Sequence, residues 1–272
     1  MIPLIRVSVL LTSVLASPAV AATPLQPTEK WRLNYEDAQC NAHRNYGTEK
    51  EPLYLAFKAP PVGSVVQLMV VQNGPRMNAL QYNVQVKVGD RRALKTNMLV
   101  YRGKSGKFRT KLIILPRAEF EAFRDAASVE ITGIGQDYLF ALSDIGPLLK
   151  ALDDCLTDLR GYFNVSPPDT PNPRLSREPV GDLQKVFTGD DFPMHAAHLG
   201  LQGSTTMEIL IDEKGAVADC SVTETSGYST LDAQSCAIVQ ERARFGPAID
   251  AQGKPTRSSY SQRITWKLGW GT

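Results

Sequence analysis

The sequence predicts an α+β protein with two domains, and this expectation rests on three observations. Residues 52–142 contain short segments rich in Val, Leu and aromatic residues at partial period two, a pattern typical of β-strands. Residues 165–173 (VSPPDTPNP) lack apolar periodicity and are dense in proline, as in a stiff linker. Beyond them, helical and strand patterns alternate. The expected boundaries are 1–22 for an export signal, 23–163 for a β-rich α+β domain, 164–178 for the linker and 179–272 for a C-terminal domain.

The composition supports two folded, soluble domains. Hydrophobic residues make up 43% of the 272 residues and charged residues 21%, which is enough for buried cores and a hydrated surface, so intrinsic disorder is not expected. The formal net charge of +2 falls to +1 when Arg6, the only charged residue among the first 22, is lost with the export signal. A nearly neutral exported chain gives no reason to expect a nucleic-acid partner.

The N-terminus carries the pattern of a secretory signal peptide. Arg6 precedes the apolar run 7–15, and Ala19 and Ala21 form the A-x-A pattern that signal peptidase cleaves. Cleavage after Ala21 or Ala22 would release a periplasmic protein. The alternative is an uncleaved anchor in the inner membrane with the domains facing the periplasm. The apolar run is shorter than the ~20 residues that span a bilayer, and Pro18 interrupts it, which favours cleavage.

The four cysteines are even in number and suit an oxidising compartment. They are Cys40, Cys155, Cys220 and Cys236. Four cysteines allow three connectivities, and the sequence alone does not choose between them. We favour pairs 40–155 and 220–236, because each bond would then lie inside one domain. Free buried cysteines or a reactive pair are the alternative, although no C-x-x-C motif indicates a redox enzyme.

The N-terminal domain is expected to contain several strands and two helices. Strands are predicted over 52–58, 65–71, 80–88, 98–102, 108–115, 129–133 and 138–142, with a hairpin turn at 103–106. Pro116 opens a helix that continues through Phe123, and Ser143 is the predicted cap of a final amphipathic helix that carries Cys155. No specific function is evident in this domain.

Basic residues gather around the predicted hairpin. They are Arg102, Lys104, Lys107, Arg109 and Lys111. One interpretation is a contact with an anionic envelope polymer. The favoured interpretation is a charged, solvated sheet edge that discourages aggregation.

The C-terminal segment has an ordered series of motifs that predicts helix, strand, strand, helix, strand. In order they are Phe192-Pro193, Ala196, Gly200-x-x-Gly203, alternating Met207, Ile209 and Ile211, Asp212 with Gly215 and Val217, Ser226-Gly227, Leu231-Asp232, Arg244-Phe245, Pro247-Ala248, Gly253 with Pro255, and alternating Ile264, Trp266 and Leu268. Pro193 suits a first helical turn after the capping candidates Asp190 and Asp191, and Gly215 suits a tight turn. This series resembles the C-terminal domain of the TonB energy-transducer family over about residues 183–269.

The resemblance implies a domain of two helices and a three-stranded antiparallel sheet, together with a role in transport across the envelope. An exposed strand over 259–268 would accept an extended segment of an outer-membrane TonB-dependent receptor or another envelope protein by strand addition. The candidate partner-binding residues are Tyr260, Gln262, Ile264, Trp266 and Leu268. A structural or scaffold protein that self-associates through the same strand is the alternative.

Two departures from the family argue against direct energy coupling. A complete transducer retains a membrane helix and has a long spacer rich in proline, lysine and glutamate, whereas this chain has a cleavable-looking signal and a short linker. If the signal is uncleaved, a membrane-anchored energy transducer becomes the alternative function.

An enzymatic function would have to use scarce residues. The only histidines are His43, His195 and His198. His195 and His198 could approach a zinc ion together with Asp190 or Asp191, but the motif HExxH is absent. Ser226 with Asp232 and a histidine could imitate a hydrolase triad, but no G-x-S-x-G surrounds the serine. No catalytic residue, cofactor or metal is therefore expected.

Overall fold

A nine-stranded antiparallel sheet forms the N-terminal domain in the computed structural model, which describes residues 23–36, 38–74, 79–102, 106–133, 136–166, 170 and 172–269. The strands are β1 (Arg32–Glu36), β2 (Gln39–Asn45), β3 (Leu53–Lys58), β4 (Val65–Asn73), β5 (Leu80–Val88), β6 (Leu94–Arg102), β7 (Phe108–Pro116), β8 (Ser128–Thr132) and β9 (Tyr138–Ala141). Their order in the sheet is β1-β2-β3-β4-β7-β6-β5-β8-β9. The helices are α1 (Arg117–Glu121), the short 3-10 helix η1 (Ala122–Asp125) and α2 (Ile145–Tyr162). This arrangement confirms the α+β prediction.

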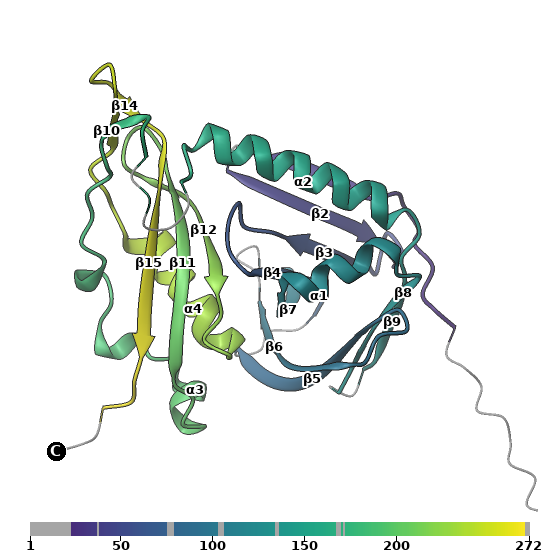
Figure 1. Cartoon of the computed structure of the whole chain (residues 1–272). Coiled ribbons are helices and arrows are strands. Elements are labelled where there is room, and N and C mark those ends of the chain that lie inside the picture. Colours follow the sequence, from purple (N-terminus) through teal and green to yellow (C-terminus); the bar gives the residue numbers. More distant parts are fainter. Residues whose placement is uncertain are drawn as a thin grey trace, which may run out of the picture.

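The sheet curls around its helices, so that its inner face and α2 enclose one core (Figure 1). Period-two alternation places Val66, Leu68 and Val70 of β4 in this core, which also contains Leu149 and Leu152 of α2. The curl brings a side chain of β9 into contact with one of β4, although these strands are not neighbours in the sheet. The hydroxyl oxygen of Tyr138 on β9 lies 2.9 Å from the Oε1 oxygen of Gln72 on β4.

The structure corrects one local prediction for this domain and adds two strands that were not predicted. Ser143 does not cap α2, because Asp144 takes the N-cap position with a φ of 58° and no side-chain cap bond. The carbonyl oxygen of Ser143 instead accepts a hydrogen bond from Arg44 at 2.6 Å. Strands β1 and β2 were not predicted, since the polar residues within them, such as Asn41 and Arg44, obscure the alternation.

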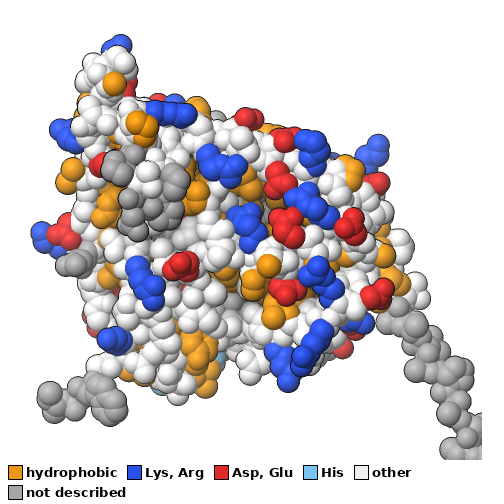
Figure 2. All heavy atoms as spheres, in the orientation of Figure 1, with side chains coloured by type: hydrophobic (Ala, Val, Ile, Leu, Met, Phe, Trp, Pro, Cys, Tyr) orange, Lys and Arg blue, Asp and Glu red, His pale blue; other side chains and the backbone are white. Residues whose placement is uncertain are grey.

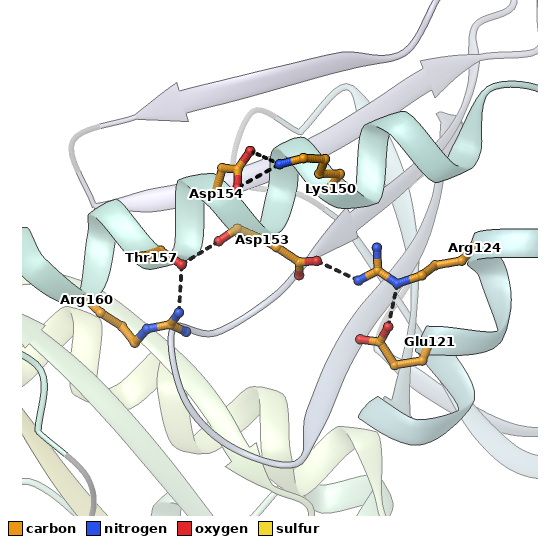
Figure 3. Close-up of polar contacts among 7 residues, drawn as sticks. All are labelled: Glu121, Arg124, Lys150, Asp153, Asp154, Thr157 and Arg160. Carbon is orange, nitrogen blue, oxygen red and sulfur yellow. Dashed lines mark hydrogen bonds and ion pairs between the residues drawn. The ribbon is translucent and has the colours of Figure 1, made fainter.

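The outer face of α2 is a solvated surface on which charges occur in pairs. Lys150 pairs with Asp154 at 2.9 Å, and Arg124 of η1 pairs with Asp153 at 2.6 Å (Figure 3). Figure 2 shows cations and carboxylates interspersed over this face. Such exposed pairs contribute little to stability, typically about 0 to 1 kcal/mol each.

The C-terminal domain contains two small sheets and two helices. Its elements are β10 (Leu175–Arg177), η2 (Leu183–Lys185), η3 (Gly189–Asp191), α3 (Met194–His198), β11 (Gly203–Ile211), β12 (Val217–Glu224), α4 (Ser229–Arg242), β13 (Ala248–Asp250), β14 (Pro255–Thr256) and β15 (Ser258–Trp266). The antiparallel orders are β12-β11-β15 and β10-β13-β14. The predicted order of helix, strand, strand, helix, strand corresponds to α3, β11, β12, α4 and β15. Asp190 and Asp191 lie in η3 and do not cap α3, whose N-cap is Pro193.

Both disulfides join a strand to a helix within one domain. Cys40 of β2 is bonded to Cys155 of α2, and Cys220 of β12 is bonded to Cys236 of α4. These bonds confirm the predicted pairs 40–155 and 220–236. Each bond therefore holds a helix against the sheet on which it packs.

Part of the segment predicted as a linker is built into the C-terminal domain. Leu175–Arg177 forms β10, which pairs with β13, and the side-chain amide of Asn164 donates to the carbonyl oxygen of Arg257 at 2.8 Å. Residues 167–169 and 171 lie outside the described residues. The described part of this segment is therefore held against the second domain and does not act as a free spacer.

The two domains pack directly against each other. Helix α4 lies against β5, β6 and β7 on the outer face of the large sheet, and β12 lies against β4. Val222 of β12 forms an apolar cluster with Val65 and Ile114. None of the helices in the described residues has the length and apolar character needed to span a membrane. The predicted export signal, residues 1–22, lies outside the described residues.

Candidate functional site: the free edge of β15

Strand β15 forms one edge of the three-stranded sheet (Figure 1). It pairs with β11 along its whole length, from Ser258 opposite Ile211 to Trp266 opposite Gly203. No described strand pairs with its other side. An edge strand of this kind presents a row of unpaired N–H and C=O groups that can pair with another extended chain.

The opposite edge of the same sheet, β12, is covered by the N-terminal domain. The backbone N–H and the hydroxyl of Ser64 donate to the carbonyl oxygen of Thr223, at 2.9 and 3.0 Å. Gly63 packs so closely that a Cβ atom there would lie 2.5 Å from the Cβ of Thr223. Docking of the two domains therefore leaves β15 as the accessible edge of this sheet.

Trp266, one of the predicted partner-binding residues, is a core residue. Its side chain is only 5% exposed, and its indole N–H donates to the hydroxyl of Ser235 on α4 at 2.9 Å. Its ring packs edge-on against Phe187 and Phe192, with ring centroids 5.9 and 5.6 Å away. The side chain of Trp266 fixes β15 to α4 and faces away from any partner at the edge.

The other predicted residues lie along β15 or just after it. Tyr260 and Ile264 are half-buried against the core, and the ring of Tyr260 lies 5.4 Å from that of Phe245. The side-chain amide of Gln262 donates to the carbonyl oxygen of Arg263 at 2.8 Å. Leu268 follows the strand, and its backbone N–H donates to the side-chain oxygen of Gln202 at 3.1 Å.

Sequence reasoning missed the residues on the other face of β15. Ser261, Arg263 and Thr265 are exposed, since they alternate with the core-facing residues. Alternating apolar residues indicate the buried face of a strand. The polar residues between them indicate its accessible face, and these were the residues to choose as partner-binding candidates.

A buried carboxyl group lies on the same face of the sheet, on the neighbouring strand β11. Glu208, opposite Ser261, is 4% exposed. Burial raises the pKa of Glu208, while hydrogen bonds from Ser259 and Ser261 act in the opposite direction. Ser259 and Ser261 of β15 thus form hydrogen bonds with the buried carboxyl group of Glu208 on β11, the strand next to the free edge.

The alternative catalytic and metal sites do not assemble. Asp191 pairs with Arg242 at 2.8 Å and accepts the backbone N–H of Thr188 at 2.7 Å, so its carboxylate serves the local structure. The described residues contain no group of three His, Cys, Asp or Glu that could hold a metal ion. Asp232 accepts hydrogen bonds from Thr205 and from the backbone N–H of Ser226, at 2.7 and 2.8 Å, where a triad would require a histidine.

A cavity of about 860 Å³ lies between the domains. Leu99 and Leu112 from the large sheet line one side, and Met194, His195 and Ala237 from α3 and α4 line the other. The cation in its wall, Lys58, is engaged by Asp219 at 2.6 Å. Among the described residues that line the cavity, no hydrogen bond joins a potential nucleophile to a base.

The three-stranded sheet is thus backed by helix α4 and has one covered edge, at β12, and one edge, at β15, that no described strand pairs with. Residues 189–268 match the family described as Gram-negative bacterial TonB protein C-terminal. The match falls within residues 183–269, where the sequence resembles this family, and confirms that resemblance. The family is a non-catalytic protein-interaction domain of the Gram-negative envelope. No curated protein and no solved structure matches the chain.

Proposed function

We propose that this protein is a periplasmic binding module that contacts an outer-membrane TonB-dependent receptor, or another envelope protein, by strand addition at β15. The observation that carries the proposal is the difference between the two edges of one sheet. The edge at β12 is covered through Ser64 and Thr223, while β15 has no described strand on its outer side. Main-chain pairing supplies affinity in this mode and makes modest demands on side chains.

The burial of the apolar residues on β15 supports main-chain recognition. Trp266 is engaged by Ser235, and Tyr260 and Ile264 face the core. A partner that adds to β15 would meet the backbone edge and the small or polar residues Ser261 and Thr265 on the exposed face. Receptors with different side chains at the paired segment could therefore use the same edge.

Proline substitution tests the backbone edge directly. Successive residues of an antiparallel edge strand direct their backbone groups alternately toward and away from the neighbouring strand. One of Ser261→Pro and Gln262→Pro therefore removes an N–H that pairs with β11, and the other removes an outward N–H. Circular dichroism shows which proline variant remains folded. We expect that variant to no longer capture receptors from an outer-membrane extract, whereas Ser261→Ala and Gln262→Ala should still capture them. Continued capture by a folded proline variant would contradict strand addition.

Photo-cross-linking locates the partner and separates the competing functions. A photoreactive residue in place of Thr265 on β15 should form an adduct with a TonB-dependent receptor. The control is the same residue in place of Lys87, which is exposed on β5 of the other domain. An adduct between two copies of this chain would instead favour a self-associating scaffold, and the absence of any adduct would also reject the receptor proposal.

The cellular location is part of the proposal. The signal-peptide pattern supports removal of the export signal and release of the protein into the periplasm. Mass spectrometry of the native protein should find an N-terminus near Ala22 or Thr23. Recovery of only the full-length chain from the inner-membrane fraction would favour a membrane-anchored energy transducer.

A further inference from the structure

Three cations lie together on the inner face of the large sheet, and we call Arg102, Arg109 and Lys111 the basic cluster. Arg109 of β7 lies directly between Gln72 of β4 and Arg102 of β6 in one cross-strand row. Lys111 lies two residues farther along β7, and the next alternate residue, Ile113, is in the core. The cluster therefore continues the apolar inner face toward one end of the sheet.

The position of these strands rules out the charged-edge interpretation of the basic hairpin. Strands β6 and β7 lie in the middle of the nine-stranded order, with β4 on one side and β5 on the other. Lys111 is only 3% exposed. Two of the basic residues, Arg102 and Arg109, are half-buried, so the cluster is not a solvated rim that repels another sheet.

The ammonium group of Lys111 contacts the phenol of Tyr138. It donates to the hydroxyl oxygen of Tyr138, and the nitrogen lies 4.4 Å from the centre of the tyrosine ring. The hydroxyl of Tyr138 can in turn donate to the side-chain oxygen of Gln72 or Gln136, at 2.9 and 2.8 Å. Burial raises the pKa of Tyr138 to about 12, so the phenol remains neutral and its oxygen supplies no compensating negative charge.

No described carboxylate neutralises the basic cluster. None of its members forms an ion pair with a described residue, whereas Lys150 and Arg124 on the α2 side are paired (Figure 3). Asp137, next to Tyr138 in the sequence, accepts the backbone N–H of Gly133 at 3.2 Å. The sequences that connect β4 to β5 (GPRMNA) and β6 to β7 (GKSGK) contain cations and no carboxylate.

This arrangement is unfavourable without a counterion. Like charges directly opposite each other on a sheet are destabilising, and a buried cation without a partner costs more. Burial and the nearby Arg109 lower the pKa of Lys111 to about 8. The Nε donors of Arg102 and Arg109 are buried and have no hydrogen-bond acceptor among the described residues. Several donors and positive charges thus converge where the described residues supply an acceptor for Lys111, but none for the two Nε donors and no ion-pair partner for any of the three cations.

Two glycines make room for the guanidinium groups. A Cβ atom on Gly74 would lie 2.6 Å from Nε of Arg109, and one on Gly106 would lie 2.8 Å from a terminal guanidinium nitrogen of Arg102. Gly106 also has a φ of 69°, which disfavours other residues. The lack of a side chain at both glycines therefore leaves space for the two arginine side chains where the structure places them.

We propose that the basic cluster binds the phosphate group of a small anionic ligand. Each member of the cluster is a donor, and arginine matches the oxygens of a phosphate through paired N–H groups. A phosphate offers several acceptor oxygens and up to two negative charges to three cations, which fits the excess of positive charge better than a single carboxylate. The site is in the N-terminal domain and is independent of the edge of β15.

Calorimetric titration of the full mature protein with inorganic phosphate at pH 7 tests this site. Glucose 1-phosphate, acetate and sodium chloride at equal ionic strength serve as further titrants. We expect saturable binding of inorganic phosphate or the phosphate ester, with at least tenfold weaker binding in Arg109→Gln and Lys111→Met. Arg91→Gln, which removes an exposed cation after β5, should bind as the wild type does.

Three results would overturn the proposal. The first is that neither phosphate titrant gives a heat larger than that of sodium chloride. The second is that the wild type and both cluster variants bind phosphate with equal affinity. The third is that acetate alone shows saturable binding. Circular dichroism establishes that each variant is folded, and Arg102→Gln provides an additional cluster variant if one of the first two unfolds. Binding only of the ester would assign the site to an organic phosphate, and binding of both titrants would assign it to the phosphate group itself.

Discussion

The ammonium of Lys58 lies 2.6 Å from the carboxylate of Asp219 and joins β3 to β12 across the two domains. The side chain of Asp219 is buried, with 3% of its surface exposed, and that of Lys58 is largely buried, with 13% exposed. Gln39 donates to the same carboxylate at 2.9 Å, and Ser221 donates to its other oxygen at 2.9 Å. The domains therefore share a buried, directional polar contact, which favours a single docked orientation.

Removing the two partners of this ion pair should have unequal effects. Asp219→Ala leaves the ammonium of Lys58 buried without its acceptor and should lower the free energy of unfolding by about 3 kcal/mol. Lys58→Met should cost less, because Gln39 and Ser221 still donate to Asp219. Urea denaturation measures both. Arg124→Ala, which breaks exposed pairs, is the control and should cost less than about 1 kcal/mol. Equal losses at positions 58 and 219 would contradict this account.

The N-terminal domain caps helix α4, whose own N-cap residue, Tyr228, makes no side-chain cap bond. The side-chain oxygen of Asn97 accepts the N–H of Ser229 at 2.7 Å, and that of Gln81 accepts the N–H of Thr230 at 3.1 Å. Asn97→Ala should lower stability by about 1 kcal/mol and speed hydrogen exchange at the first turn of α4.

The control for this capping prediction is Gln85→Ala, an exposed change on the same strand as Gln81. It should leave exchange at Ser229 and Thr230 unchanged. If Asn97→Ala also leaves exchange in the first turn of α4 unchanged, the cap from the other domain has no energetic role.

Lys111→Met should stabilise the protein at neutral pH in phosphate-free buffer. Burial lowers the pKa of Lys111 from 10.5 to about 8 in the folded state, so folding disfavours its charged form. Below pH 8 the wild type carries the full penalty. Between pH 8 and 10.5 the unfolded chain binds more protons than the folded one, so wild-type stability rises with pH. The variant should gain about 1 kcal/mol at pH 7, after allowing for screening, with a smaller gain toward pH 10.

Thermal denaturation of wild type and Lys111→Met across this pH range measures the difference. Lys87→Met is the control, since Lys87 is exposed on the same sheet and its removal should not create a pH-dependent difference. A stability gain that does not change between pH 7 and pH 10 would show that the lysine charge is not its cause.

The two disulfides should contribute unequally to stability. Cys40 and Cys155 are 115 residues apart, whereas Cys220 and Cys236 are 16 apart. Loop-closure entropy then predicts losses of about 5 kcal/mol for the double serine variant of the first pair and about 3 kcal/mol for that of the second. Guanidinium denaturation of the two variants gives the order, and a larger loss from the short loop would show that local strain or packing outweighs chain entropy.

Local patterns in the sequence determined most of the elements. Alternation placed Met207, Ile209 and Ile211 on one buried face of β11, and the positive φ of Gly215, 81°, fits the turn that its position predicted. The TonB-like order of motifs was readable because each motif depends on residues only a few positions apart. Strands β1 and β2 were not predicted, because their polar residues form contacts with distant parts of the chain, such as the hydrogen bond from Arg44 to the carbonyl oxygen of Ser143.

The tertiary structure alone decided which parts of these elements are available. The sequence indicated that a terminal strand exists and that Trp266 alternates with Ile264, but a core contact with Ser235 removed the tryptophan side chain from the accessible edge. Domain docking and the free edge depend on pairs such as Ser64 and Thr223, which are 159 residues apart. Periodicity reports how a residue relates to its near neighbours along the chain, whereas covering one sheet edge requires packing between surfaces that only the complete fold brings together.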